Sequence, residues 1–93
     1  MFDHSDVRSN FPILSRQVNG KPLVYLDNGA SAQKPQVVID AIRTAYSHEY
    51  ANVHRGLHYL SNLATDKYEN VRSISARFLG VADERQILMN SGT

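Results

Sequence analysis

The amino-acid sequence predicts a mainly helical segment of an α/β protein, with one short hairpin-like strand and one C-terminal strand. Three observations lead to this class. Apolar residues recur at helical spacing over two segments, residues 35–49 and 61–79. An Asn-Gly pair lies between two β-prone runs, which is typical of a tight turn. An apolar run at residues 87–89 leads into small polar residues, as expected for a buried parallel strand that enters a loop.

Length and composition describe one small domain or a part of one. The chain has 93 residues, of which 42% are hydrophobic and 20% charged, as is ordinary for a soluble globular protein. The formal net charge is only +1 and the basic residues are scattered. A nucleic-acid surface needs a patch or stripe of Lys and Arg, so we expect no nucleic-acid partner.

The sequence carries no sign of secretion or membrane insertion. Its start lacks a basic region followed by an apolar run, and no apolar segment approaches the roughly 20 residues needed to cross a bilayer. There is no cysteine, which excludes disulfides, thiolate metal sites and a cysteine nucleophile within these residues. We expect a cytoplasmic protein with no membrane partner.

The first element expected along the chain is a short helix. Asp3 resembles a helix N-cap, and Asp6 lies where a carboxylate interacts favourably with the helix dipole. Pro12 should end this helix early, because proline disfavours helical geometry in the residue before it.

A turn, a strand and a loop should follow. Asn19 and Gly20 predict the tight turn, because both residue types tolerate positive φ. Residues 23–26, Leu-Val-Tyr-Leu, then predict a short strand. Residues 27–33 predict a small polar loop in which little side-chain bulk blocks approach to the backbone.

Two helices are expected, over residues 35–49 and 61–79. Pro35 suits the first turn of the first helix, Ser61 is the expected N-cap of the second, and Gly80 is well placed to end it. Each helix carries an apolar stripe that should form its inner face. The stripes consist of Val38, Ile39, Ile42, Ala45 and Tyr46 in the first helix, and of Ala64, Tyr68, Val71, Ile74, Ser75 and Phe78 in the second.

The C-terminal residues predict the start of an anion-binding turn. Residues 83–86 should form a turn and residues 87–89 the strand. Residues 90–93, Asn-Ser-Gly-Thr, supply small residues with available backbone N–H groups, which is how a strand passes into a helix whose N-terminus holds an anion. The helix that would complete such a site would follow Thr93.

His54 and His58 are the first candidate functional residues. Four residues apart, they would share one face of a helix and could chelate a metal, but Gly56 between them weakens a helix by about 1 kcal/mol. No Asp or Glu lies within residues 51–61 to act as a third ligand. The alternative is a pair of loop histidines that bond to backbone carbonyls, and we expect no metal site.

Arg55, beside a glycine in an expected loop, has two interpretations. Its guanidinium suits a carboxylate, a phosphate or an acidic group of a neighbouring subunit. It could equally form a surface salt bridge worth at most about 1 kcal/mol. The sequence defines no Ser-His-Asp arrangement and no pair of carboxylates placed for acid–base chemistry.

Three segments, taken in order, resemble the N-terminal region of cysteine desulfurases. They are NFPILSRQVNGKPLVYLDNGASAQKPQVVIDAI, YANVHRGLHYLSNLATDKYENVR and ILMNSGT, and together they cover nearly the whole chain. The most specific parts are YLDNGASAQKP and ANVHRGLH. The chain is most similar to the SufS-like branch of the class V aminotransferase family.

This resemblance implies an enzyme that uses pyridoxal phosphate (PLP), has the PLP-dependent transferase fold type I, and converts L-cysteine to L-alanine. In that family a lysine holds the cofactor, and a cysteine thiolate takes the sulfur as a persulfide, passing it to an acceptor protein for iron–sulfur cluster assembly. The fold pairs a large, mainly parallel sheet domain with a smaller one, in a homodimer. Residues 1–33 would belong to the small domain and residues 86–93 would begin the cofactor-binding turn of the large domain.

The resemblance also implies roles for five residues. Ala30, in the loop after the expected strand, would lie on the substrate side of the cofactor. His54 and Arg55 would lie at the active-site entrance, close to the subunit boundary. Gly92 and Thr93 would open the turn that binds the cofactor phosphate.

The sequence departs from the family pattern mainly in what it lacks. Gly29 stands where the family usually has alanine, none of Lys21, Lys34 and Lys67 matches the motif of the cofactor lysine, and there is no cysteine. Because the cofactor carries the chemistry and must be anchored, we expect these 93 residues alone to be inactive. The alternatives are a non-catalytic helical interaction module, or another class V relative such as a selenocysteine lyase.

Overall fold

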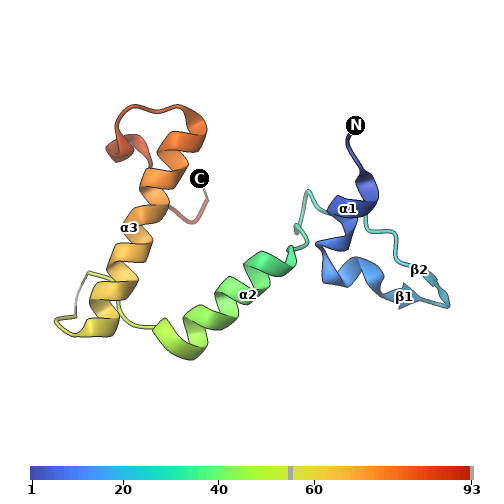
Figure 1. Ribbon diagram of the computed structural model, residues 1–93, viewed down its shortest axis with the longest axis horizontal. Helices are drawn as coiled ribbons and strands as arrows, with labels where there is room; N and C mark the ends of the chain where they lie inside the picture. Colours follow the sequence, from blue (N-terminus) through green and yellow to red (C-terminus); the bar gives the residue numbers. More distant parts are fainter. Residues whose placement is uncertain (55, 93) are drawn as a thin grey trace. The chain divides into compact units, whose positions relative to one another are not determined.

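A computed structural model describes residues 1–54 and 56–92, which form two compact units (Figure 1). The first unit, Met1–Tyr46, holds α1 (His4–Ser9), the 3-10 helix η1 (Pro12–Ser15), the strands β1 (Gln17–Val18) and β2 (Lys21–Pro22), and α2 (Gln36–Thr44). The π-helix η2 (Ala45–Glu49) spans the boundary at residue 47. The second unit holds α3 (Tyr59–Leu79) and the 3-10 helix η3 (Glu84–Gln86).

The short N-terminal helix α1 begins where the sequence predicts. The Asp3 carboxylate accepts a hydrogen bond from the Ser5 backbone N–H (2.9 Å), which confirms Asp3 as the N-cap. The helix ends before Pro12, and Pro12 itself starts η1. The proline therefore stops one helix and opens the next, since its fixed φ suits a first helical turn.

Hydrogen bonds from α1 and its end tie the first unit together. The Arg8 guanidinium donates to the carbonyl oxygens of Leu14 (3.3 Å) and Leu23 (3.0 Å), which lie on either side of the hairpin. The backbone N–H of Gln36, at the start of α2, donates to the Asn10 carbonyl (2.7 Å). These contacts bring separate parts of the sequence together without a large apolar core.

The predicted turn is confirmed, but the predicted strand after it is wrong. β1 and β2 pair antiparallel around Asn19 and Gly20, which have φ of 53° and 75°. Pairing ends at Pro22, and residues 23–26 are irregular. One further backbone bond, from the Leu23 N–H to the Arg16 carbonyl (3.1 Å), continues beyond Pro22. The 3-10 helix η1 ends just before Arg16, so no extended chain lies there to pair with the rest of residues 23–26.

The helix α2 and the π-helix η2 together occupy residues 36–49. Pro35 has an extended backbone and is the N-cap of α2, not a residue of its first turn. The apolar stripe on α2 is not buried: Val38, Ile39 and Ile42 are 39%, 41% and 50% exposed. This stripe borders an open cavity of about 370 Å³, lined by Ile13, Gln33, Lys34, Ile39 and Ile42.

The long helix α3 begins two residues before the predicted helix and ends where predicted. Its N-cap is His58, whose Nδ1 accepts a hydrogen bond from the Ser61 N–H (3.3 Å), so the prediction that Ser61 is the N-cap is wrong. Gly80, with φ of 72°, ends the helix as predicted. The N–H of Val81 bonds to the Ala76 carbonyl (2.8 Å), completing a Schellman arrangement in which glycine supplies the left-handed residue.

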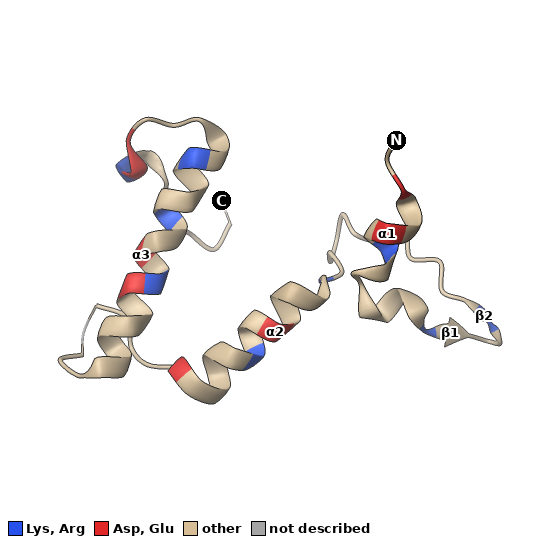
Figure 2. Cartoon of the chain, in the orientation of Figure 1, with Lys and Arg blue, Asp and Glu red and all other residues tan. Residues whose placement is uncertain are grey.

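Very little of the described chain is buried. Ala76 and Ser61 are the only buried side chains in residues 1–54 and 56–92, and the α3 stripe expected to face inward is largely exposed. Charged residues of both signs are distributed along the helices (Figure 2). Hydrophobic stabilisation scales with the apolar area removed from water, so each unit depends largely on local helix and turn interactions.

The C-terminal strand predicted at residues 87–89 is also wrong, since these residues are irregular. A parallel strand exists only beside another strand, and the described residues form a single sheet, of β1 and β2. The mainly helical character with one short hairpin agrees with the prediction. No helix within the described residues combines the length and the apolarity that crossing a bilayer requires.

Candidate functional site

The candidate site is the loop between η2 and α3, together with the part of α3 that lies against it. His54 is in this loop, and Arg55, the neighbouring predicted site residue, lies outside the described residues. The backbone of His54 has φ of 66°, a left-handed conformation that is uncommon for residues other than glycine. Such a conformation costs on the order of 1–3 kcal/mol and persists only where the surroundings enforce it.

Three contacts with α3 hold His54 in place. Its backbone N–H donates to Thr65 Oγ1 (2.9 Å), and its ring Nε2 lies 2.7 Å from Glu69 Oε1. The ring also meets Tyr68 edge to face, with the ring centroids 5.6 Å apart. Tyr68 and Glu69 lie three and four residues after Thr65, so both are neighbours of Thr65 on one side of the helix.

The contact with Glu69 fixes how the His54 ring can act. An ionised carboxylate only accepts hydrogen bonds, so a neutral ring donates through Nε2 and keeps Nδ1 as its acceptor atom. The other oxygen of Glu69, Oε2, lies 3.5 Å from Nε of Arg72. Because the side chains of His54 and Glu69 are 50% and 46% exposed, their pairing contributes at most about 1 kcal/mol to stability.

A buried hydroxyl fixes the remainder of the loop. Ser61 is 1% exposed; its Oγ accepts from the Gly56 N–H (2.9 Å) and donates to the Asn52 carbonyl (2.5 Å). A Cβ at Gly56 would lie 2.4 Å from both Cβ and Oγ of Ser61, so only glycine fits there. The Thr65 hydroxyl likewise makes two hydrogen bonds: it accepts from the His54 backbone N–H and donates to the Ser61 carbonyl (2.9 Å).

The two candidate histidines have separate structural tasks. His58 caps α3 through Nδ1, whereas His54 pairs with Glu69. Within the part of the chain that the structure describes, no group of three or more His, Asp or Glu side chains could hold a metal ion. The arrangement is that of loop histidines, but their partners are a helix N-terminus and a carboxylate where the sequence suggested backbone carbonyls.

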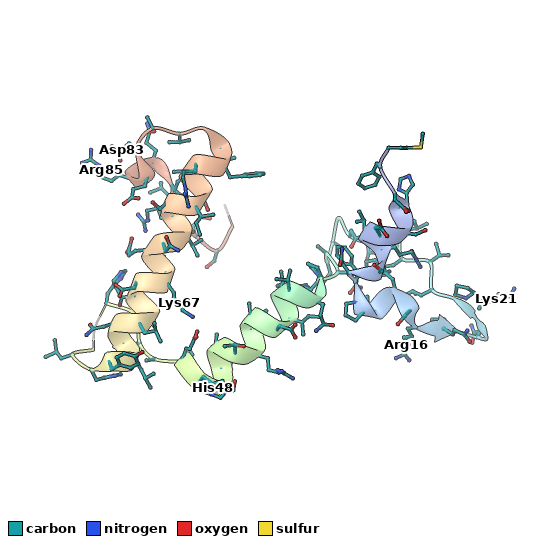
Figure 3. The ribbon with its side chains drawn as sticks, viewed as in Figure 1. Arg16, Lys21, His48, Lys67, Asp83 and Arg85 are labelled. Atoms are coloured by element: carbon teal, nitrogen blue, oxygen red, sulfur yellow. The ribbon has the colours of Figure 1, made fainter. Side chains whose placement is uncertain are left out.

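Two further ion pairs lie in the second unit. Lys67 Nζ lies 2.6 Å from Glu49 Oε2. The guanidinium of Arg85 donates to both carboxylate oxygens of Asp83, and the two side chains lie next to each other in Figure 3. The Arg85 guanidinium, aided by the Arg85 backbone N–H, lowers the pKa of Asp83, and Asp83 in turn raises the pKa of Arg85. The Asp83 pair stabilises the start of η3, after α3 has ended.

Ala30 lies in the first unit, in a turn closed by its own hydrogen bonds. The backbone N–H groups of Ala30 and Ser31 both donate to the Asp27 carbonyl (3.1 and 3.0 Å). The Tyr25 hydroxyl donates to the Ser31 carbonyl (2.7 Å). The turn therefore exposes a small side chain at a position fixed by local contacts.

The predicted cofactor turn is described only in part. Gly92 has φ of 104°, in the region that favours glycine, and nothing lies within 4 Å of a Cβ placed there. Thr93, the other residue assigned to this turn, lies outside the described residues.

Three residues of the site are not predicted by the sequence analysis. The sequence predicts Ser61 as a helix cap, not as a loop contact, and gives no role to Thr65 or Glu69. The signal that could have found them is their spacing, since polar residues four apart lie on one face of a helix.

The chain is similar to proteins named cysteine desulfurase along its whole length. It is 50% identical over 93 residues to probable cysteine desulfurase 1 of Mycobacterium leprae and to cysteine desulfurase of Escherichia coli K12. All of this chain is covered, but only 15% and 23% of the two relatives, respectively. The chain therefore spans less than a quarter of the length of these curated relatives.

A solved structure and a family model agree with these similarities. The apo structure of cysteine desulfurase from Thermococcus onnurineus NA1 superposes with a TM-score of 0.70 at 40% identity, covering 87% of this chain and 19% of that one. Residues 24–93 match the model of the aminotransferase class-V family. Since this match takes in most of the sequence, the chain belongs to the aminotransferase class-V family.

Proposed function

We propose that these residues are the N-terminal part of a PLP-dependent cysteine desulfurase, which converts L-cysteine to L-alanine and passes the sulfur on as a persulfide. The observation that carries the proposal is the 50% identity over all 93 residues to proteins named cysteine desulfurase. The enzyme would be a homodimer of fold type I that hands its sulfur to an acceptor protein for iron–sulfur cluster assembly. The motifs YLDNGASAQKP and ANVHRGLH support this finer assignment.

The residues present fit one part of the cofactor, its phosphate group. The backbone conformation of Gly92 and the open space beside its Cα suit a turn whose N–H groups face an anion. Gly92 and Thr93 would contribute backbone N–H groups to that turn. When bound, PLP would supply the electron sink for the reaction, and Gly92 and Thr93 would hold its phosphate end.

The covalent anchor of the cofactor would come from polypeptide outside these residues. Lys34 donates to the Ala32 carbonyl (2.7 Å) and Lys67 is paired with Glu49, so both amines already have partners in their own units. The sequence has no cysteine to carry the sulfur. The 93 residues would therefore be inactive by themselves.

The loop at the candidate site would orient the amino-acid substrate at the entrance. His54 would accept a hydrogen bond from the substrate ammonium through Nδ1, since Nε2 is directed to Glu69. Arg55 would bind the substrate carboxylate, for which a guanidinium has the matching pair of donors. Ala30 would leave room on the substrate side because its side chain is a single methyl group.

The test compares this chain with the polypeptide that its reading frame encodes beyond Thr93. Each is mixed with PLP, L-cysteine and an excess of a thiol reductant, which reduces the persulfide and frees its sulfur as sulfide, and the alanine and sulfide formed are measured. We expect no product from the 93 residues and equal amounts of both products from the longer polypeptide. Turnover by the 93 residues at an enzymatic rate would refute the proposal.

Two other outcomes would favour the alternatives. A longer polypeptide that releases alanine from L-selenocysteine, and none from L-cysteine, would be a selenocysteine lyase. A reading frame that stops at Thr93 would favour a non-catalytic interaction module.

A further inference from the structure

We propose that one face of α3, formed by Ser61, Thr65 and Glu69, is a template that sets the conformation of the loop carrying His54. These three residues, the template face, would be positioning residues for the site. The inference rests on the proposed function for what His54 does with substrate. Its structural half, that the template face holds the loop, can be tested without that function.

The first contact of the template face is made by Ser61. Its hydroxyl accepts from the Gly56 N–H and donates to the Asn52 carbonyl, so one side chain fixes the backbone at two points of the loop. A hydroxyl is suited to this because it can accept and donate at once. The lack of space for a Cβ at Gly56 shows how closely the loop backbone approaches the helix.

The second and third contacts both hold His54. Thr65 accepts from its backbone N–H and Glu69 pairs with its ring, so the template face binds both the main chain and the side chain of this residue. His54 has a left-handed backbone, and local preference does not favour that conformation in a residue with a Cβ. The contacts with α3 therefore compensate for an unfavourable backbone.

The helix itself does not need these hydroxyls. Its N-cap is supplied by His58, so the Ser61 hydroxyl is not required at the helix start. The Thr65 hydroxyl donates back to the carbonyl four residues earlier, an arrangement that slightly destabilises a helix. Both groups are instead explained by what they bind in the loop.

A template of this kind would hold His54 in its binding conformation before the substrate binds. Groups that are already ordered lose less conformational freedom on binding. Weakening the template face should therefore raise the KM for L-cysteine more than it lowers kcat, because the loop would bind substrate at the entrance and take no part in the sulfur transfer.

The first experiment measures amide hydrogen exchange in the 93-residue chain. Thr65→Val removes the hydroxyl at nearly constant volume, Thr65→Ser restores it, and Ser73→Ala is the matched control, since Ser73 on α3 bonds to Glu84 and not to the loop. We expect Thr65→Val to speed exchange of the His54 N–H about tenfold, as for the loss of one ordinary hydrogen bond. Thr65→Ser and Ser73→Ala should leave it near the wild-type rate.

Several results would overturn the template. A wild-type His54 N–H that exchanges as fast as an unstructured amide would do so, as would equal protection in Thr65→Val and wild type. Loss of protection in Ser73→Ala to the same degree would show a general effect of weakening α3. If Thr65→Val unfolds the helix, Thr65→Ser must still protect His54 as the wild type does.

The second experiment uses the longer polypeptide with PLP and L-cysteine. Thr65→Val should raise KM several-fold with a smaller change in kcat, Thr65→Ser should restore KM, and Ser73→Ala should change neither. An unchanged KM together with lost protection of the His54 N–H would refute the effect of the template face on substrate binding, while its hold on the loop would stand. Absence of any cysteine turnover in the wild type would refute the proposed function and leave the exchange result standing.

Discussion

Nε2 of His54 lies 2.7 Å from Oε1 of Glu69, a residue 15 positions further along the chain. The pair joins a loop residue with a left-handed backbone to a regular position on α3. Arg72 approaches the other carboxylate oxygen at 3.5 Å, so Glu69 is held from two sides. Both side chains are about half exposed, so the pair adds little stability. Its main effect is to orient the His54 ring, with Nε2 facing Glu69.

Glu69→Gln should therefore cost little stability while keeping the ring in place. Glutamine retains an acceptor oxygen in the same position, and a half-exposed ion pair contributes at most about 1 kcal/mol. Ring-proton contacts between His54 and Tyr68, measured by NMR, should persist in Glu69→Gln and disappear in Glu69→Ala. The control is Glu84→Gln, which changes a carboxylate bound by Ser73. If Glu69→Gln disrupts the ring contacts as fully as Glu69→Ala, the charge itself is required.

Gly56→Ala should disrupt the loop far more than the same change at Gly29. A Cβ at Gly56 would lie 2.4 Å from two atoms of Ser61, whereas nothing lies within 4 Å of one at Gly29. Overpacking of a fitted contact costs about 1–3 kcal/mol. Hydrogen exchange at residue 56 should rise steeply in Gly56→Ala, while Gly29→Ala should leave loop and helix exchange unchanged. Equal effects of the two substitutions would contradict the close approach of the loop to Ser61.

Features set by neighbouring residues could be predicted from the sequence. The Asp3 cap, the turn at Asn19 and Gly20, and the helix end at Gly80 all depend on side chains or φ preferences within a few positions. The structure has each of them in place. The short apolar run at residues 23–26 predicts a strand that the structure does not contain. A strand depends on a partner strand, and the run itself does not specify one.

The candidate site shows the same limit at the level of single residues. A serine near a helix start predicts a cap, but the His58 ring takes that place and Ser61 binds the loop instead. The left-handed backbone of His54 is disfavoured by its residue type, so no local rule predicts it. The ANVHRGLH segment contains both loop histidines, but their partners, Glu69 for His54 and Ser61 for His58, lie outside it. The geometry of the two rings therefore could not be predicted from the motif.

Asp83 should titrate below its ordinary pKa of 3.8, owing chiefly to its hydrogen bonds with the Arg85 side chain. A carboxyl whose pKa is lowered by folding stabilises the folded state above its unfolded pKa, and this stabilisation is lost as the pH falls through the folded value. The ordering at the start of η3 should therefore weaken below about pH 4. The measurement is an NMR titration of the Asp83 side-chain carbon.

Arg85→Ala should return the Asp83 pKa toward its ordinary value. Arg16→Ala is the control, because Arg16 belongs to the first unit and should leave the titration unchanged. A titration of Asp83 that is the same in Arg85→Ala and wild type would show that the paired guanidinium does not cause the shift.

The exposed apolar face of α2 should make the isolated chain associate with itself. Ile42 is 50% exposed and lines the open cavity beside Ile13 and Ile39, and contiguous apolar surface of this kind favours association. Sedimentation velocity should show concentration-dependent dimers or larger species. Ile42→Glu should shift the chain toward monomer, because burying an unpaired carboxylate in such a contact is unfavourable.

The matched control is Val37→Glu, which adds the same charge to the same helix. Val37 is 73% exposed and does not line the cavity, so this variant should associate nearly as the wild type does. Equal loss of association in both variants would mean that net charge, not the face around Ile42, governs it. A wild-type chain that stays monomeric as its concentration rises would show that this face alone is too small to hold two copies together, since association must first overcome the entropy of bringing them together.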